Sequence, residues 1–187
     1  ARLEETYQCI VEQRPYPEAV KLILGEAMVA CLLLVGCIKF EGELNLQFEG
    51  SDVLPVMIVQ CDHLLNVRAF ARFAEDHTAS EYQQAFLNGK MMFMIKQNHQ
   101  TETYQSHIPI TSTSMGQNLM NFFAMSEQVA TQVHIAINKN RVVGFLLQLL
   151  PGQDTIQREL FWEYATVIGK SISDDELLNL DNQTILH

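Results

Sequence analysis

Residues 27–38 read Ala-Met-Val-Ala-Cys-Leu-Leu-Leu-Val-Gly-Cys-Ile, twelve residues without one polar side chain. The run follows Pro17-Glu18, and a proline beside an acidic residue suits the first turn of a helix, so we expect one helix from Pro17 to about Lys39. A surface helix would show a polar stripe, and none follows Glu26. The fully apolar run is also shorter than the roughly 20 residues of a membrane span. We therefore expect a helix that is buried between two other layers.

Composition places the chain among soluble globular proteins. Its 187 residues are 48% hydrophobic and 18% charged, which suits one domain with an appendage or two small domains. A net charge of -10 repels phosphate backbones, and no basic patch is interleaved with aromatic residues, so we expect no nucleic-acid partner. With no signal peptide and no long apolar span, we expect a cytoplasmic protein without a membrane partner. The chain begins at Ala1 without a methionine, so we also expect a fragment of a longer protein.

Beyond the apolar run, the spacing of hydrophobic residues changes from helical to alternating. In residues 40–50, Leu44, Leu46 and Phe48 fall on one face, which predicts a half-exposed antiparallel strand. Runs at 56–61 and 67–73 complete a meander of three strands. The other elements that we expect before residue 151 are helices over 3–13, 79–87 and about 114–125, and strands over 91–95, 103–110, 133–137 and 143–150.

Pro151-Gly152 separates this mixed region from a helical tail. Apolar residues recur at helical spacing over 156–168, and Ser173-Asp174-Asp175-Glu176 is an N-cap pattern ahead of two leucines. We therefore predict a core domain over 1–152 and a helical segment over 153–187. Because strands and helices are mixed without strict alternation, the predicted class is α+β, with two mostly antiparallel sheets packed around buried central helices.

The cysteines and histidines do not predict a metal site. Cys9, Cys31, Cys37 and Cys61 show no C-x-C or C-x-x-C spacing, and we interpret them as buried, reduced thiols that pack as small hydrophobic groups. The six histidines are scattered without ligand spacing. We expect no metal and no cofactor in this chain.

A search for catalytic motifs favours a binding protein over an enzyme. The sequence has no G-x-S-x-G, Walker A, H-E-x-x-H or dinucleotide-binding pattern, so we assign no catalytic residue. Glu26 in the apolar helix could act as an acid or base, or could cap a helix or pair with a lysine. Ser126-Glu127 could form an active-site loop, or could bond the unpaired backbone groups of a helix end. The alternative function is a small-molecule enzyme with a site near Glu26 or His134.

Methionine is grouped in two of the expected elements. Met91, Met92 and Met94 fall in one strand, and Met115, Met120 and Met125 in one helix. Such side chains give an adaptable apolar surface for varied partners, or they fill irregular gaps in the core.

Ordered blocks along the chain carry a family resemblance. They begin with Tyr16-Pro17 and continue through Leu24-Gly25-Glu26-Ala27, Lys39-Phe40-Glu41-Gly42, Arg68-Ala69-Phe70-Ala71, residues 121–128 (Asn-Phe-Phe-Ala-Met-Ser-Glu-Gln), residues 144–151 (Gly-Phe-Leu-Leu-Gln-Leu-Leu-Pro) and Asp175-Glu176-Leu177-Leu178. In this order they resemble the redox-regulated 33-kDa heat-shock chaperone family over essentially the whole chain. Two details depart from the family pattern: residues 51–55 replace a glycine-rich turn, and Ala69 stands where glycine is common.

The resemblance implies a holdase chaperone that works without ATP, binds unfolding client proteins under oxidative stress and forms a homodimer. It also implies a C-terminal domain in which four cysteines hold zinc and form disulfides on oxidation. The four cysteines of this chain do not match that pattern, so the resemblance covers the core and the start of the linker, without the zinc domain.

These implications lead to a mechanism in which the helical tail covers an apolar face of one sheet and uncovers it when displaced. The candidate client-contacting residues are Leu44, Leu46 and Phe48 on one strand, or Phe145, Leu147 and Leu149 on another. The competing interpretation is that these faces belong to the core.

Overall fold

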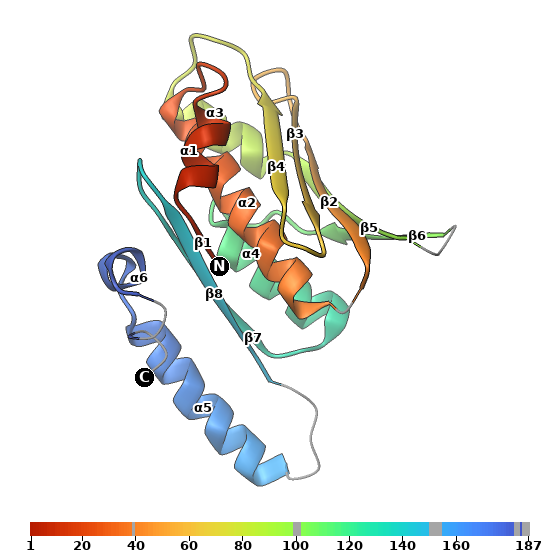
Figure 1. Cartoon of the computed structure of the whole chain (residues 1–187), viewed down its shortest axis with the longest axis vertical. Coiled ribbons are helices and arrows are strands. Elements are labelled where there is room, and N and C mark those ends of the chain that lie inside the picture. The colour runs from red at the N-terminus through yellow and green to blue at the C-terminus, as the bar shows by residue number, and fades with distance from the viewer. Residues whose placement is uncertain (39, 99–101, 150–154, 182–183, 185–187) are drawn as a thin grey trace.

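The computed structural model describes residues 1–38, 40–98, 102–149, 155–181 and 184. The chain folds into layers, with helices between a larger and a smaller antiparallel sheet and two further helices outside the smaller one (Figure 1). The elements are, in order, β1 (Arg2–Leu3), α1 (Glu5–Val11), α2 (Glu18–Cys37), β2 (Gly42–Glu49), β3 (Val56–Asp62), β4 (Val67–Arg72), α3 (Ala79–Leu87), β5 (Lys90–Gln97), β6 (Thr103–Ile108), α4 (Met115–Phe122), the π-helical turn η1 (Phe123–Glu127), β7 (Thr131–Ile137), β8 (Val142–Gln148), α5 (Thr155–Ser171) and α6 (Asp174–Asn179).

The larger sheet has the strand order β4-β3-β2-β5-β6. Its central strand β2 alternates between buried and half-buried residues, as the period-2 spacing predicts. Leu44 lies opposite Cys61 on β3 and Ile95 on β5, so the buried faces of three neighbouring strands coincide. This face forms one wall of the main hydrophobic core.

The smaller sheet has the order β1-β8-β7. The β7–β8 hairpin follows the predicted strands closely, with Ile137 opposite Val142 across the turn. The expected helix over residues 3–13 is wrong at its start, because Arg2 and Leu3 form β1 and pair with Val143 and Val142. This two-residue strand ties the beginning of the chain to β8.

Helix α2 runs between the two sheets (Figure 1). Residues 27–35 are at most 8% exposed, as expected for a helix covered on nearly every side. Two small residues let the layers approach: a methyl group on Gly25 would lie 2.5 Å from Cδ1 of Ile137, and one on Gly144 would lie 2.5 Å from Cγ1 of Val29. The helix ends at Cys37, and the predicted end at Lys39 lies outside the described residues.

The length argument against a membrane span is wrong for α2. The helix has 20 residues and, by length and composition alone, is apolar enough to cross a membrane. However, 67% of its most apolar window is buried inside the fold, as in the core helix of a globular domain.

The α+β class with two antiparallel sheets around central helices is confirmed. Helix α4 begins as predicted, with the Ser114 hydroxyl accepting a hydrogen bond from the Gln117 N–H. It ends at Phe122, earlier than predicted, because the chain widens into η1. The boundary predicted at Pro151-Gly152 lies outside the described residues, and the division at residue 152 stays a prediction.

Candidate functional site

The first predicted contact face is part of the core. Leu44, Leu46 and Phe48 are 0%, 1% and 0% exposed, and the ring of Phe48 stacks on that of Phe86, with 5.4 Å between centroids. In this folded state the three side chains are not accessible to a client. A contact with a client at this face stays a prediction that would require the larger sheet to separate from α2.

The second predicted face lies on the outside of the smaller sheet, where Phe145, Leu147 and Leu149 are half-buried. Helix α5 approaches β8 at Gly169: a methyl group there would lie 3.2 Å from Cδ1 of Leu147 and 3.6 Å from Cε2 of Phe145. Leu149 follows the strand, and its N–H donates to the carbonyl oxygen of Ala130. The helical tail therefore covers part of this apolar face, in the arrangement that the sequence suggests.

Helix α6 attaches the tail to the sheet. Leu177 and Leu178 pack into a small buried cluster with Ala136 and Val143. Arg2 donates to the carbonyl oxygen of Leu178 at 2.9 Å, to that of Leu177 at 3.1 Å, and to Leu180. Positive charge at carbonyl groups left free by a helix C-terminus is stabilising.

Two further contacts hold α6 at its ends. Arg141 adds a second guanidinium, which donates to the carbonyl oxygen of Leu178 at 3.0 Å. At the other end, Nε2 of His134 lies 2.7 Å from Oδ1 of Asp174 in the first turn of α6. Ser173 and Glu176 form the predicted capping box, with both reciprocal hydrogen bonds present.

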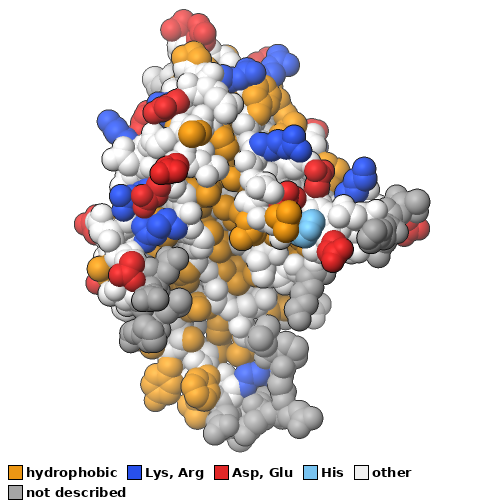
Figure 2. All heavy atoms as spheres, in the orientation of Figure 1, with side chains coloured by type: hydrophobic (Ala, Val, Ile, Leu, Met, Phe, Trp, Pro, Cys, Tyr) orange, Lys and Arg blue, Asp and Glu red, His pale blue; other side chains and the backbone are white. Residues whose placement is uncertain are grey.

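The outer side of α5 is apolar. Its residues at 160, 161, 164, 167 and 168 fall on one helical face and are 48–72% exposed: Leu160, Phe161, Tyr164, Val167 and Ile168. We call these five residues the α5 stripe. Figure 2 shows hydrophobic side chains in a band down the middle of one face of the molecule and again at its lower end. The tail thus covers one apolar surface and presents another.

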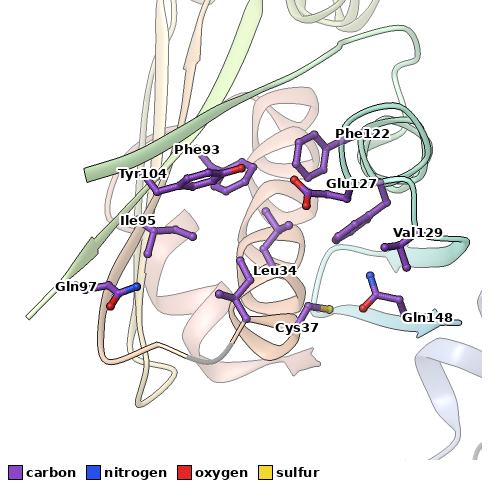
Figure 3. A pocket seen from close by; sticks show the side chains of 12 residues that line it. Leu34, Cys37, Phe93, Ile95, Gln97, Tyr104, Phe122, Glu127, Val129 and Gln148 are labelled. Atoms are coloured by element: carbon purple, nitrogen blue, oxygen red, sulfur yellow. The ribbon is translucent and has the colours of Figure 1, made fainter. Parts of the chain in front are cut away.

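A cavity of about 630 Å³ opens between the larger sheet and the end of α4 (Figure 3). Its apolar walls come from α2, β5, β6, α4 and η1, and its polar groups are two glutamines, one carboxylate, one thiol and the hydroxyl of Tyr104. The lining residues are Leu34, Cys37, Ile38, Phe93, Ile95, Gln97, Tyr104, Phe122, Phe123, Glu127, Val129 and Gln148. We call this cavity the inter-sheet pocket.

Four aromatic rings form a continuous wall of the pocket. The ring centroids of Tyr104 and Phe93 are 5.9 Å apart, those of Phe93 and Phe122 5.3 Å, and those of Phe122 and Phe123 5.4 Å. Such distances and tilted rings are the favourable geometry for aromatic pairs. Three of the rings are buried, whereas Tyr104 is 53% exposed and stands at the rim.

The π-helical turn η1 brings Glu127 to this wall. The turn ends at Gln128, which has a left-handed φ of 54° and donates its N–H to the carbonyl oxygen of Phe123. A non-glycine residue in this conformation costs about 1–2 kcal/mol, and such strain and π-turns occur often at functional sites. In the part of the chain that the structure describes, neither Ser126 nor Glu127 bonds a backbone group through its side chain, so the expected capping role is wrong.

The cysteines are only partly as expected. Cys31 and Cys61 are buried, but Cys9 is exposed and Cys37 is half-buried beside the inter-sheet pocket. Burial raises the pKa of the Cys37 thiol, which keeps it protonated and a poor nucleophile at neutral pH. Among the described residues no group of three or more His, Cys, Asp or Glu side chains could hold a metal ion, so the zinc of the resembled family has no fitting site there.

The two residues of the alternative enzyme site have structural partners. Glu26 accepts a hydrogen bond from the N–H of Met115 at 2.9 Å and so caps the first turn of α4. Desolvation by burial raises its pKa, the Met115 bond opposes this, and the charge of Asp174 adds to the increase. His134 faces Asp174 instead. A raised pKa suits an acid or base, but the carboxylate is already engaged in joining α2 to α4.

Comparison with known proteins decides the family. The family model described as Hsp33 protein matches residues 1–187. The chain belongs to the Hsp33 family. This confirms the resemblance that the ordered blocks of sequence carry.

Curated relatives of this Hsp33-family chain share one name. A 33 kDa chaperonin of Pseudomonas savastanoi pv. phaseolicola is 34% identical over 190 residues, which is 99% of this chain and 63% of that protein. The 33 kDa chaperonin of Pseudomonas aeruginosa is 34% identical over 189 residues, or 99% and 64%. The chain therefore spans less than two thirds of the length of these relatives.

A solved structure shares the fold. The crystal structure of the 33 kDa chaperonin from Thermotoga maritima matches with a TM-score of 0.77 at 18% identity, over 98% of this chain and 67% of that one. At this identity the likeness supports the fold, which agrees with the layers described above.

Proposed function

We propose that this chain is the folded core of an ATP-independent holdase chaperone that binds unfolding proteins and prevents their aggregation. The proposal rests on two apolar surfaces. Helix α5 covers Phe145 and Leu147 on the smaller sheet, and the α5 stripe on its other side stays exposed. Monomeric proteins rarely keep large contiguous apolar patches on their surface, and such patches mark sites of interaction. The name chaperonin, carried by the relatives, supports the same class.

In this proposal the tail works as a hinged cover. Helix α6 keeps the tail on the smaller sheet, and α5 swings away to uncover Phe145, Leu147 and the neighbouring part of β8. The clients are partly unfolded proteins, whose exposed apolar side chains match this surface. Neither step needs nucleotide.

The rest of the proposal follows the family resemblance. The active form is a cytoplasmic homodimer, and oxidative stress is sensed by a zinc-binding, disulfide-forming domain in the part of the relatives that this chain does not span. The described cysteines do not supply that switch. This chain would then respond to the switch through its tail, without carrying the switch itself.

The test is an aggregation assay without ATP, with a thermally unfolding enzyme as the client. A chain ending at residue 152 should suppress aggregation better than the 187-residue chain and should bind more of an apolar dye, because the outer face of β8 is uncovered. Circular dichroism must show that the shortened chain retains its fold. A folded but no more active chain would contradict the covering role.

A double substitution tests the covering role without shortening the chain. Arg2→Gln with Arg141→Gln deletes the guanidinium bonds to the end of α6 and leaves every apolar side chain in place. It should shift activity in the same direction as truncation, by a smaller amount. Lys139→Gln, which removes one positive charge from the nearby β7–β8 turn, is the control and should have no effect.

A further inference from the structure

The inter-sheet pocket combines features that recognise a cation. It has an apolar interior, a wall of four aromatic rings and one carboxylate, and no basic side chain is among its lining residues in the described part of the chain. Aromatic faces attract ammonium and guanidinium groups, and the attraction grows when the cation is desolvated. A volume of about 630 Å³ is within the usual range of ligand sites.

Glu127 is the polar group that decides the charge of the ligand. Figure 3 shows it pointing from η1 into the pocket, toward the wall that carries Phe93 and Tyr104. No described residue forms an ion pair or a side-chain hydrogen bond with its carboxylate. The Glu127 side chain is exposed to solvent but lines the pocket without a partner among the described residues, and a cation that enters the pocket would supply one. Gln97 and Gln148 add neutral hydrogen-bonding groups at the edges.

Charge outside the pocket favours the same ligand. The whole chain carries a net charge of -10. A field of this sign raises the local concentration of basic segments and lowers that of acidic ones. The Glu127 carboxylate and the net charge of the chain therefore both favour a positively charged ligand.

We propose that the inter-sheet pocket binds a lysine or arginine side chain of an unfolded polypeptide, with apolar side chains of the same segment lying along the aromatic wall. The proposal rests on the proposed chaperone function and names the class of client segment. In an extended segment, alternate residues point to the same side, about 6.6 Å apart. A basic residue with apolar residues two positions before and after it can thus place all three side chains into one cavity.

The experiment measures fluorescence anisotropy of two labelled peptides on the 187-residue chain. Both carry apolar residues at alternate positions, and they differ only at the centre, which is lysine in one and acetyl-lysine in the other. The lysine peptide should bind about fivefold or more tightly than the acetyl-lysine peptide, the size of one cation–π or carboxylate contact. Equal affinities would overturn the proposal.

Variants assign this preference to the pocket. Glu127→Gln should remove most of the preference, with the remainder coming from the aromatic rings, and should leave the affinity for the acetyl-lysine peptide unchanged. Glu12→Gln removes the same charge from an exposed position, the C-cap of α1, and should keep the preference. Tyr104→Leu keeps the rim apolar and should reduce the preference by removing one ring. If Glu127→Gln and Glu12→Gln act equally, bulk charge explains the preference and the proposal fails.

Two further outcomes separate this proposal from the function on which it rests. If both peptides bind equally while client aggregation is still suppressed, the pocket assignment fails and the chaperone function stands. If neither peptide binds and aggregation is not suppressed, the proposed function fails as well. Phenethylammonium chloride is added as a small-molecule competitor of the labelled peptides. If it displaces both peptides and the chain shows no preference between them, the assignment to a polypeptide side chain is overturned.

Discussion

Helices α5 and α6 form one tail but attach to the core in different ways. Helix α6 has six residues, and α5 has 17. The shorter helix has both leucines buried, two arginines at its C-terminal carbonyl groups and a complete capping box. The longer helix touches β8 around Gly169 and keeps the α5 stripe exposed.

The difference shows that attachment in this tail follows local chemistry and not helix length. Burial of two leucines and several charge-assisted hydrogen bonds hold α6, whereas α5 leaves much of its apolar surface in water. Elements with few buried apolar contacts open at the lowest free energy. We therefore expect α5 to be the part of the tail that opens first, with α6 as its anchor.

The largest expected effect comes from making the same substitution on both helices. Leu177→Ala removes a side chain that is 1% exposed and should cost roughly 2–5 kcal/mol of local stability. Leu160→Ala, at 48% exposed, should change stability by no more than about 0.5 kcal/mol. Amide hydrogen exchange is the measurement, and residues 174–179 should lose protection only in Leu177→Ala.

The two leucine variants also test which helix anchors the tail. If Leu160→Ala releases the α6 amides as strongly as Leu177→Ala does, the tail opens as one unit and the contrast between the helices is wrong. Protection in the β2 and β5 amides serves as an internal reference, because both strands lie in the main core.

A smaller effect is expected from the cap of α6. Ser173→Ala removes the hydroxyl that accepts from the Glu176 N–H, and the loss of such a cap costs about 1 kcal/mol. Thr78→Ala removes the equivalent hydroxyl from α3. The first variant should increase dye binding and proteolysis in the tail with the melting temperature of the core unchanged.

The Thr78→Ala variant should do the opposite, lowering the melting temperature without opening the tail, because α3 packs on the main core through Tyr82 and Phe86. Identical responses of the two variants would mean that tail and core unfold together.

Much of this architecture could be predicted from local sequence, since alternation in β2 and the apolar run of α2 are short-range patterns. The capping box at Ser173 is likewise a four-residue signal. The anchors of α6 could not be predicted, because Arg2 lies 176 residues from the carbonyl group of Leu178 that it bonds. Strand β1 could not be predicted for the same reason. Two residues are too few to show an alternating pattern, and the partner strand β8 is far away in the sequence.

The inter-sheet pocket also could not be predicted from the sequence. Its aromatic wall joins β5, β6, α4 and η1, and only the folded layers bring these elements together. The signal that could have indicated it is the pair Phe122-Phe123 followed by Glu127, because a regular helix would not keep both rings and the carboxylate on one side. The π-turn resolves this conflict.

The smallest effects come from two carboxylates whose pKa values shift in opposite directions. Desolvation by burial raises the pKa of Glu26 above its ordinary value of 4.5, whereas hydrogen bonds from the backbone and hydroxyl of Ser173 lower that of Glu176. The contribution of Glu26 to the free energy of unfolding is fully present below pH 4.5 and is lost as the pH rises through the raised pKa. For Glu176 the stability is present above pH 4.5 and is lost as the pH falls through the lowered pKa.

The effects of Glu26→Gln and Glu176→Gln on stability should therefore depend on pH in different ways. Glu26→Gln keeps an oxygen for the Met115 N–H and removes the buried charge, so its melting temperature relative to the parent should rise between pH 4 and pH 8. Glu176→Gln should lose protection of the α6 amides at pH 8 and match the parent near pH 3. Asp174 contributes to the raised pKa of Glu26, so detachment of α6 should lower that pKa. If the Leu177→Ala background leaves the Glu26 titration unchanged, the anchor and the central helix are not electrostatically linked.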